Sequence, residues 1–139
     1  MLILDTNHYS EIARKSGIGI RLEQRICDAG EDAFLTIVTA GEVMKGRLAA
    51  VQPHLQSDRG VQSFLELQNS ITDIARWVVL PWTDDAADNF DSLKRMRIKT
   101  GTSDLRIASI AFEYDATVLT RNLSDFTCVP GLRVENWLD

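Results

Sequence analysis

The chain has 139 residues, of which 45% are hydrophobic and 25% are charged. This length suits one ordinary domain with its own core, and the composition excludes a disordered chain and a membrane-spanning one. We therefore expect a single domain over residues 1–139. The net charge of −5 argues against a protein that holds nucleic acid mainly through a basic surface.

The first residues carry no basic leader, and an acid follows a short apolar run, so residues 1–5 predict a first strand and not a signal peptide. We expect a cytoplasmic protein without a membrane segment. Cys27 and Cys128 are far apart and form no Cys-x-x-Cys motif, which predicts buried free thiols and no redox pair. His8 and His54 lack the helical spacing of a zinc site.

Strand patterns alternate with helical patterns along the chain. In chain order the sequence predicts a strand at 2–4, helices at 7–15 and 20–27, a strand at 33–38, helices at 39–51 and 60–76, a strand at 77–80, helices at 84–96 and 105–114, and strands at 116–120 and 132–134. Gly30 and Pro53 each end a helix. The alternation predicts an α/β fold, a three-layer α/β/α sandwich with a central, mostly parallel sheet and its last strand at an edge.

Four acidic residues stand near the ends of these elements. Asp5 follows the first strand, Glu42 lies one helical turn after the second, Asp104 opens a helix, and Asp125 lies in the loop after the strand at 116–120. Ligands of α/β folds bind outside the carboxyl ends of the strands. We therefore expect the four carboxylates to face one rim of the sheet.

Each acid also has an ordinary structural explanation. Asp5 could cap a helix, Glu42 could form a capping box with Thr39, Asp104 could complement a helix dipole, and Asp125 could form an Asx turn. Four carboxylates on one rim would nevertheless repel one another unless protons or a cation compensated them. Mg²⁺ and Mn²⁺ prefer such oxygen ligands and promote phosphodiester hydrolysis, and the sequence holds no rival catalytic motif.

Basic and aromatic residues near the acids suggest contacts with nucleic acid. Arg95, Arg106 and Arg121 could bind phosphates, and Arg121 is the strongest candidate because it follows a strand directly. Basic residues at helix ends are more often a solvated complement to the dipole. The three tryptophans could stack on bases, but core or edge packing is the preferred interpretation for all of them: Trp77, Trp82 and Trp137.

The order and spacing of several segments resemble PIN-domain nucleases, and within them the VapC-type toxins of bacterial toxin–antitoxin pairs. The segments are 4–7 (LDTN), Glu42 with Gly46, 101–108 (GTSDLRIA), 119–126 (LTRNLSDF) and 129–137 (VPGLRVENW). The resemblance covers essentially the whole chain. Ser103 departs from it, because related sequences commonly have an apolar residue there.

The resemblance implies a parallel α/β/α sandwich, endoribonuclease activity on RNA, a Mg²⁺ or Mn²⁺ cofactor, a homodimer and inhibition by a small antitoxin protein. It implies metal binding or catalysis by the four acids, of which Asp125 is the least secure. It also implies a polar supporting role for Thr6, Asn7, Thr120 and Asn122.

Three other functions stay open. A phosphohydrolase that forms an aspartyl-phosphate would need a second aspartate where this chain has Asn7. A phosphoacceptor signalling domain would need a lysine after its last strand, where the chain has Arg121. A catalytically inactive PIN-like binding module would need no intact acids.

Overall fold

The computed structural model describes residues 1–56 and 59–139. Its strands are β1 (Leu2–Leu4), β2 (Ala33–Thr36), β3 (Val79–Leu80), β4 (Thr117–Leu119) and β5 (Arg133–Glu135). Its helices are α1 (Thr6–Ala13), α2 (Gly17–Ala29), α3 (Ile37–Val51), α4 (Val61–Ile74), α5 (Asp84–Arg95), α6 (Thr102–Glu113) and α7 (Leu123–Phe126), with a 3₁₀ turn η1 (Gln52–His54).

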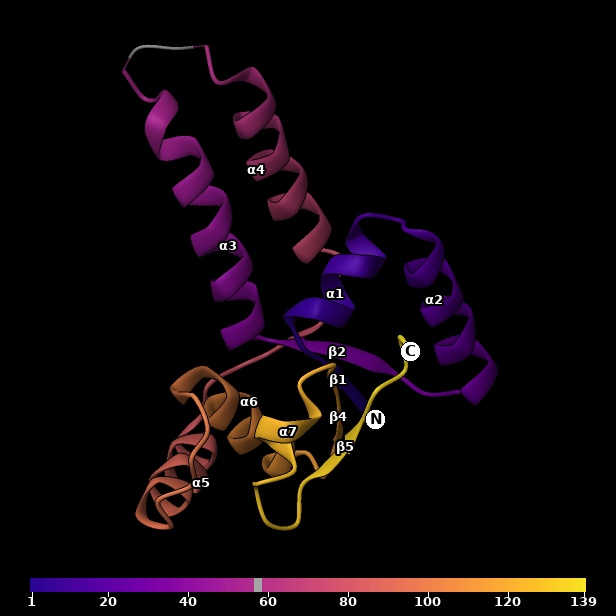
Figure 1. Ribbon diagram of the computed structural model, residues 1–139, viewed down its shortest axis with the longest axis vertical. Helices are drawn as coiled ribbons and strands as arrows, with labels where there is room; N and C mark the ends of the chain where they lie inside the picture. Colours follow the sequence, from indigo (N-terminus) through magenta and orange to yellow (C-terminus); the bar gives the residue numbers. More distant parts are fainter. Residues whose placement is uncertain (57–58) are drawn as a thin grey trace.

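The strands form one five-stranded sheet in the order β3-β2-β1-β4-β5 (Figure 1). Every neighbouring pair is parallel, so that Leu2 lies beside Ala33 on one side and beside Thr117 on the other. The predicted α/β fold with a last strand at the edge is confirmed, and the sheet is wholly parallel in the described residues.

Helices cover both faces of the sheet. Successive side chains of a strand point to opposite faces, and β1 shows the result. Leu2 and Leu4 are buried against residues of α1 and α2, whereas Ile3 is buried against residues of α6. The predicted three-layer arrangement is therefore built around the central strand.

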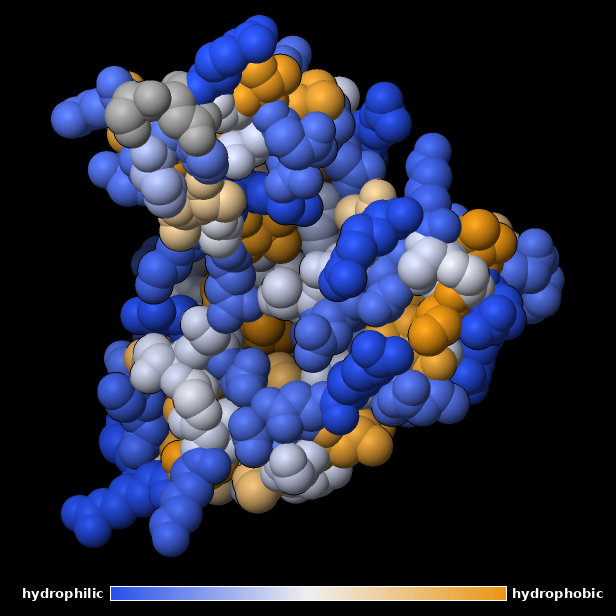
Figure 2. All heavy atoms as spheres, turned by 45° about the horizontal axis from the view of Figure 1, so that its top comes forward, coloured by the Kyte–Doolittle hydropathy of each residue, from blue (hydrophilic) through white to orange (hydrophobic). Residues whose placement is uncertain are grey.

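The helices α3 and α4 form a hairpin that stands away from the sheet (Figure 1). Several apolar side chains on its elements are exposed: Leu48, Leu55, Val61, Phe64, Leu65 and Ile71. Figure 2 shows apolar residues near the free end of the hairpin, on a face that is otherwise mostly hydrophilic. The hairpin thus carries uncovered apolar surface far from the core.

Some predicted elements differ in extent. The strand expected at 77–80 is only the pair β3, and Asp125 lies in the short helix α7 and not in a loop. The prediction of buried thiols is wrong, because Cys27 and Cys128 are free but exposed. No helix in residues 1–56 or 59–139 is both long and apolar enough to cross a membrane.

Candidate active site

Asp5 lies directly after β1, the central strand. Only 7% of the residue is exposed. Its Oδ1 atom caps α1 by accepting a hydrogen bond of 3.1 Å from the backbone N–H of His8. Its Oδ2 atom accepts a short hydrogen bond from the hydroxyl of Thr120, the residue after β4. Asp5 is therefore a helix cap, as expected, and also a carboxylate fixed at the end of the sheet.

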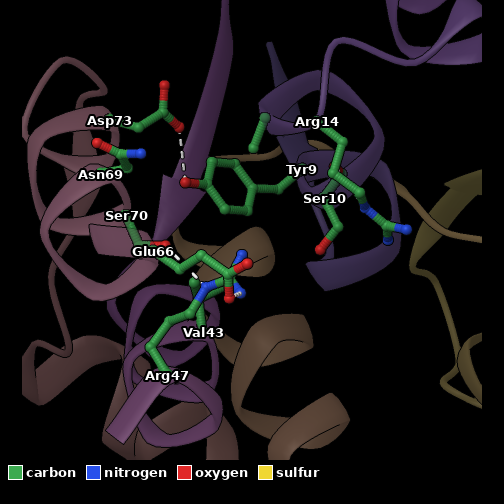
Figure 3. Close-up of a pocket in the computed structure, with 10 residues that line it drawn as sticks. Tyr9, Ser10, Arg14, Val43, Arg47, Glu66, Asn69, Ser70 and Asp73 are labelled. Carbon is green, nitrogen blue, oxygen red and sulfur yellow. Dashed lines mark hydrogen bonds and ion pairs between the residues drawn. The ribbon is translucent and has the colours of Figure 1, made fainter. Parts of the chain in front are cut away.

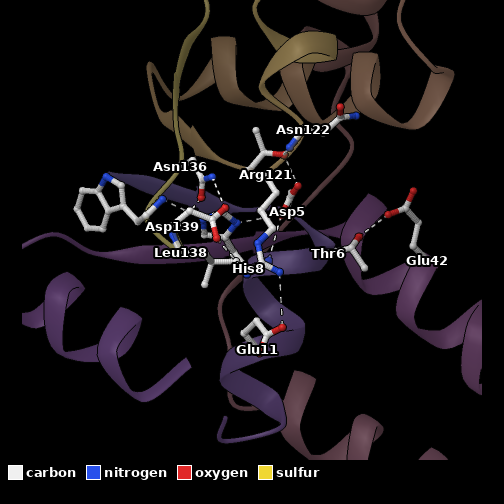
Figure 4. Close-up of polar contacts among 12 residues, drawn as sticks. Asp5, Thr6, His8, Glu11, Glu42, Arg121, Asn122, Asn136, Leu138 and Asp139 are labelled. Carbon is white, nitrogen blue, oxygen red and sulfur yellow. Dashed lines mark hydrogen bonds and ion pairs between the residues drawn. The ribbon is translucent and has the colours of Figure 1, made fainter. Parts of the chain in front are cut away.

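Glu42 lies in the second turn of α3 and reaches toward α1 (Figure 4). The hydroxyl of Thr6 donates a hydrogen bond of 2.5 Å to its Oε2 atom. The alternative capping box of Thr39 and Glu42 is not formed, because Thr36 caps α3 and its hydroxyl accepts from the N–H of Thr39 at 3.1 Å. The carboxylate of Glu42 is thus held at the rim and not at a helix end.

Asp104 lies in the first turn of α6 and is partly buried. Burial, and then the charges of Asp125, Glu42 and Asp5, raise the pKa of Asp104 to about 6. The amide of Asn122, 3.5 Å from Oδ2 of Asp104, lowers the pKa but does not outweigh these causes. The other three predicted acids therefore lie near enough to Asp104 for their charges to raise its pKa.

Asp125 reaches the same rim from α7. The amide nitrogen of Asn122 donates a hydrogen bond of 2.7 Å to Oδ2 of Asp125. The position of α7 is fixed by Phe126, which is fully buried, and by a hydrogen bond of 2.8 Å from the hydroxyl of Thr100 to the backbone carbonyl of Asp125. Asn122 contacts both Asp104 and Asp125, so it connects these two acids.

All four acids at the rim offer carboxylate oxygens, which are the ligands that hard divalent cations prefer. Within residues 1–56 and 59–139, however, no three histidine, cysteine or acidic side chains are grouped as ligands of one ion. Mg²⁺ commonly binds through one or two carboxylates and completes its shell with waters and substrate phosphates. The carboxylate oxygens are therefore of the type that could hold such an ion, but in the described residues they are not gathered into a closed cage.

Three of the four predicted supporting residues contact the acids. Thr6 binds Glu42, Thr120 binds Asp5, and Asn122 binds Asp104 and Asp125. Asn7 is exposed, and in the part of the chain that the structure describes it forms no hydrogen bond to these carboxylates.

The three candidate arginines have different surroundings. Arg121 lies 3.8 Å from Glu11 and 3.4 Å from Asp139, so acids already engage its charge (Figure 4). Arg95 donates to a backbone carbonyl of its own helix at 3.3 Å. Arg106 lies over two aromatic rings and lines a groove beside Glu42. The structure therefore favours Arg106 over Arg121 as a group available to a phosphate.

His8 is a contact of the site that the sequence reasoning missed. It is fully buried, and its Nε2 atom accepts a hydrogen bond of 3.3 Å from the backbone N–H of Trp137. An imidazole nitrogen that accepts carries no proton, so the proton lies on Nδ1, 3.3 Å from Oδ1 of Asp5. His8 thus links Asp5 to the C-terminal tail, and its place three residues after Asp5 was the available signal.

A separate polar pocket lies between α1 and the α3–α4 hairpin, with a volume of about 470 Å³ (Figure 3). Tyr9 donates a hydrogen bond of 2.6 Å to Asp73 across it. Burial, and then Asp73, raise the pKa of Tyr9. Arg47 donates to Ser70 at 2.9 Å on the same side. These polar groups are paired with one another, and the hydrogen bond of Tyr9 to Asp73 connects α1 to the hairpin.

Comparison with known proteins gives matches only among solved structures, because no family model and no curated protein matches the sequence. A chain of the DNA-bound VapBC complex from Salmonella typhimurium is 25% identical, with a TM-score of 0.75 over 98% of this chain and 97% of that one. A chain of FitAcB from Neisseria gonorrhoeae is 21% identical, with a TM-score of 0.74 over 99% and 98%.

A third match is a chain of VapBC2 from Rickettsia felis bound to a fragment of promoter DNA. It is 20% identical, with a TM-score of 0.72 over 98% of both chains. The likeness therefore extends over the whole length of the chain. It confirms that the fold resembles that of VapC-type PIN domains, as the sequence motifs predicted.

Proposed function

We propose that this protein is a metal-dependent endoribonuclease and the toxin of a toxin–antitoxin pair. One observation carries the nuclease proposal: Asn122 contacts both Asp104 and Asp125, and Asp5 is bound to Thr120 at the ends of neighbouring parallel strands. Burial and the charges of Asp125, Glu42 and Asp5 accordingly raise the pKa of Asp104 to about 6. Negative charge concentrated at the end of a parallel sheet is what a divalent cation would relieve. The structural likeness to VapBC complexes supports the biological role.

Each acid has a distinct role in this proposal. Asp5 and Asp104 would hold the principal ion, and Asp125 would complete the shell. Glu42, held by Thr6, would orient the attacking water or bind a second ion. A divalent ion bound there supplies positive charge that stabilises the phosphoryl oxygens and promotes deprotonation of the attacking water.

The direct test incubates the purified protein, freed of any bound partner, with mixed RNA and, separately, mixed DNA in Mg²⁺ or Mn²⁺. We expect cleavage of RNA that chelator abolishes, because the proposed mechanism needs the ion to activate the attacking water. Asp104→Asn is expected to lower the rate by at least about a hundredfold. Asp84→Asn, which changes an exposed acid in the first turn of α5, is the control and should cut like the wild type.

Cleavage that persists in chelator would overturn the metal mechanism. Wild-type activity in Asp104→Asn would overturn the assignment of the site, and cleavage of DNA alone would overturn the substrate class.

The second candidate is a PIN-like binding module without catalysis. It is favoured by the finding that no three ligand-type side chains in the described residues are grouped around one ion. Isothermal titration with Mg²⁺ separates the two functions. Binding that Asp104→Asn abolishes supports the nuclease, whereas no binding with or without RNA supports the inactive module.

The partners are proposed on different grounds. Apolar side chains such as Phe64 and Leu65 are exposed on the α3–α4 hairpin, which indicates a protein interface. An antitoxin or a second copy of the chain would cover them. Light scattering on the purified chain should give the mass of a homodimer. A monomer that stays monomeric at high concentration would refute the homodimer.

A further inference from the structure

A groove lies beside the acidic rim, between α3, the residues before α5, and α6. Its volume is about 480 Å³, and it shares Glu42 with the rim. Resting on the proposed nuclease function, we propose that this groove binds one nucleotide of single-stranded RNA next to the scissile phosphate. The base would lie against Trp82, and its phosphate would lie between Lys45 and Arg106.

The groove opens onto the acids because of helical spacing. Gly41, Glu42 and Lys45 fall on one face of α3, since residues three or four positions apart are neighbours on a helix. On the opposite wall Ser103 and Arg106 share a face of α6, and Ser103 directly precedes Asp104. A strand of RNA lying in the groove would therefore lead its next phosphate to the rim.

Trp82 supplies a flat apolar surface that is held in place. It is 37% exposed, and its ring packs edge-on against Phe90 with centroids 5.7 Å apart. Ile37, which is 47% exposed, adds apolar surface to the same groove. Every base has an aromatic face, so such a surface accepts single-stranded nucleic acid without regard to sequence.

The two cations of the groove are not paired with acids in the described residues. Arg106 lies 5.9 Å from the centre of the Trp82 ring and 5.3 Å from that of Phe90. Within residues 1–56 and 59–139 neither Lys45 nor Arg106 forms an ion pair, whereas Arg47 and Arg121 do. Positive charge beside the acidic rim would offset its repulsion of a phosphate.

Gly41 gives a way to fill the groove without disturbing the fold. A Cβ atom added there meets no neighbouring atom within 4 Å, and the same holds for Gly46 in the same helix, which does not line the groove. Gly41→Leu is therefore the test variant and Gly46→Leu the matched control. Both replace a helical glycine, so neither should lower the melting temperature.

The probe is a fluorescein-labelled mixed-sequence RNA of about eight nucleotides, followed by anisotropy with Ca²⁺ in place of Mg²⁺ to slow cleavage. We expect Gly41→Leu and Trp82→Leu each to weaken binding about tenfold, while Gly46→Leu binds within about twofold of the wild type. Lys45→Gln and Arg106→Gln should each reduce the slope of log K against log salt by about 0.7. An RNA duplex should bind more weakly, because its bases are already stacked.

Fluorescence gives a direct signature of the base contact. RNA should quench tryptophan emission in the wild type, and Trp82→Phe should remove that quenching, although Trp77 and Trp137 remain. Unchanged RNA binding by Gly41→Leu, or quenching that persists in Trp82→Phe, would refute the proposal that the groove binds a nucleotide. Loss of self-association in Gly41→Leu with RNA binding intact would instead assign the groove to a protein interface.

Failure of the groove and failure of the nuclease are distinguishable. If the wild type cuts no RNA under any condition but Gly41→Leu still weakens RNA binding, the nucleotide-binding groove is supported and the nuclease proposal is refuted. If Gly41→Leu both binds and cuts RNA like the wild type, nucleotide binding in the groove is refuted and the nuclease proposal is supported.

Discussion

The effect of the clustered acids on one another's charge can be tested at Asp104 without substrate. Burial and its acidic neighbours raise its pKa to about 6, from a usual value of 3.8. Between these two pH values the folded state binds more protons than the unfolded state. The free energy of unfolding should therefore fall as the pH rises through this window.

The expected effect on stability is modest because Asp104 is only partly buried. The shift corresponds to about 3 kcal/mol, which solvent screening reduces to about 1 kcal/mol. In chelator, Asp104→Asn should be more stable than the wild type by this amount near pH ~7.5 and similar to it near pH ~4. Urea unfolding at both pH values measures the difference, and a variant less stable than the wild type at the higher pH would contradict it.

His8 is predicted to position Asp5. His8→Leu removes the ring N–H donor to Asp5 and leaves the N–H of Trp137 without its acceptor, at a cost of about 2 kcal/mol. Loss of a hydrogen bond that orients a metal ligand typically lowers metal affinity 10- to 100-fold, and we expect about tenfold here. Calorimetry with Mg²⁺ and urea unfolding measure the two effects separately.

The control for this prediction is His8→Asn, whose side-chain amide keeps a donor near the position of Nδ1. It should recover most of the Mg²⁺ affinity even if it stays less stable than the wild type. Equal losses of affinity in both variants would mean that His8 acts only through packing.

At the scale of elements, the approach of α1 and α2 depends on one glycine. A Cβ atom added at Gly19 would lie 2.0 Å from the backbone oxygen of Glu11, a contact that side-chain rotation cannot relieve. We expect Gly19→Ala to destabilise the fold by about 2 kcal/mol. Gly17→Ala, in the first turn of the same helix, meets only the end of the Arg21 side chain at 3.7 Å and should be neutral or slightly stabilising.

Thermal unfolding of the two variants side by side tests the packing. Equal melting temperatures would show that α1 and α2 can move apart at little cost.

At the scale of the whole molecule, Mg²⁺ is expected to stabilise the fold, because an ion bound only by the folded state adds its binding free energy to stability. At a concentration of 100 times the dissociation constant the gain is about 2.7 kcal/mol. The gain should shrink as the pH falls through about 6, where Asp104 takes up a proton. Melting temperatures with Mg²⁺ and with chelator, measured above and below this pH, give the gain in stability.

Asp104→Asn should lose this stabilisation and Asp84→Asn should keep it. A wild-type melting temperature that Mg²⁺ changes neither with nor without RNA would refute the metal site.

The sequence by itself determined the order of the strands and of the longer helices, the α/β class and the edge position of the last strand, because periodicity and turn residues are local signals. It did not predict the short helix α7. Short-range chemistry also determined ends such as that of α2, where Gly30 takes the left-handed conformation with φ 64°. The acids at 5, 42, 104 and 125 could be chosen in advance because parallel strands end at a common edge.

Only the tertiary structure decided how those acids are used. Glu42 accepts a hydrogen bond from Thr6 and does not form the alternative capping box. Arg121 is paired with an acid, whereas Arg106 lines a groove. The tertiary structure also placed His8 between Asp5 and Trp137, residues that are far apart in the chain. Local patterns do not encode such contacts, because the side chain that a residue meets depends on which helices pack together and on the space left between them.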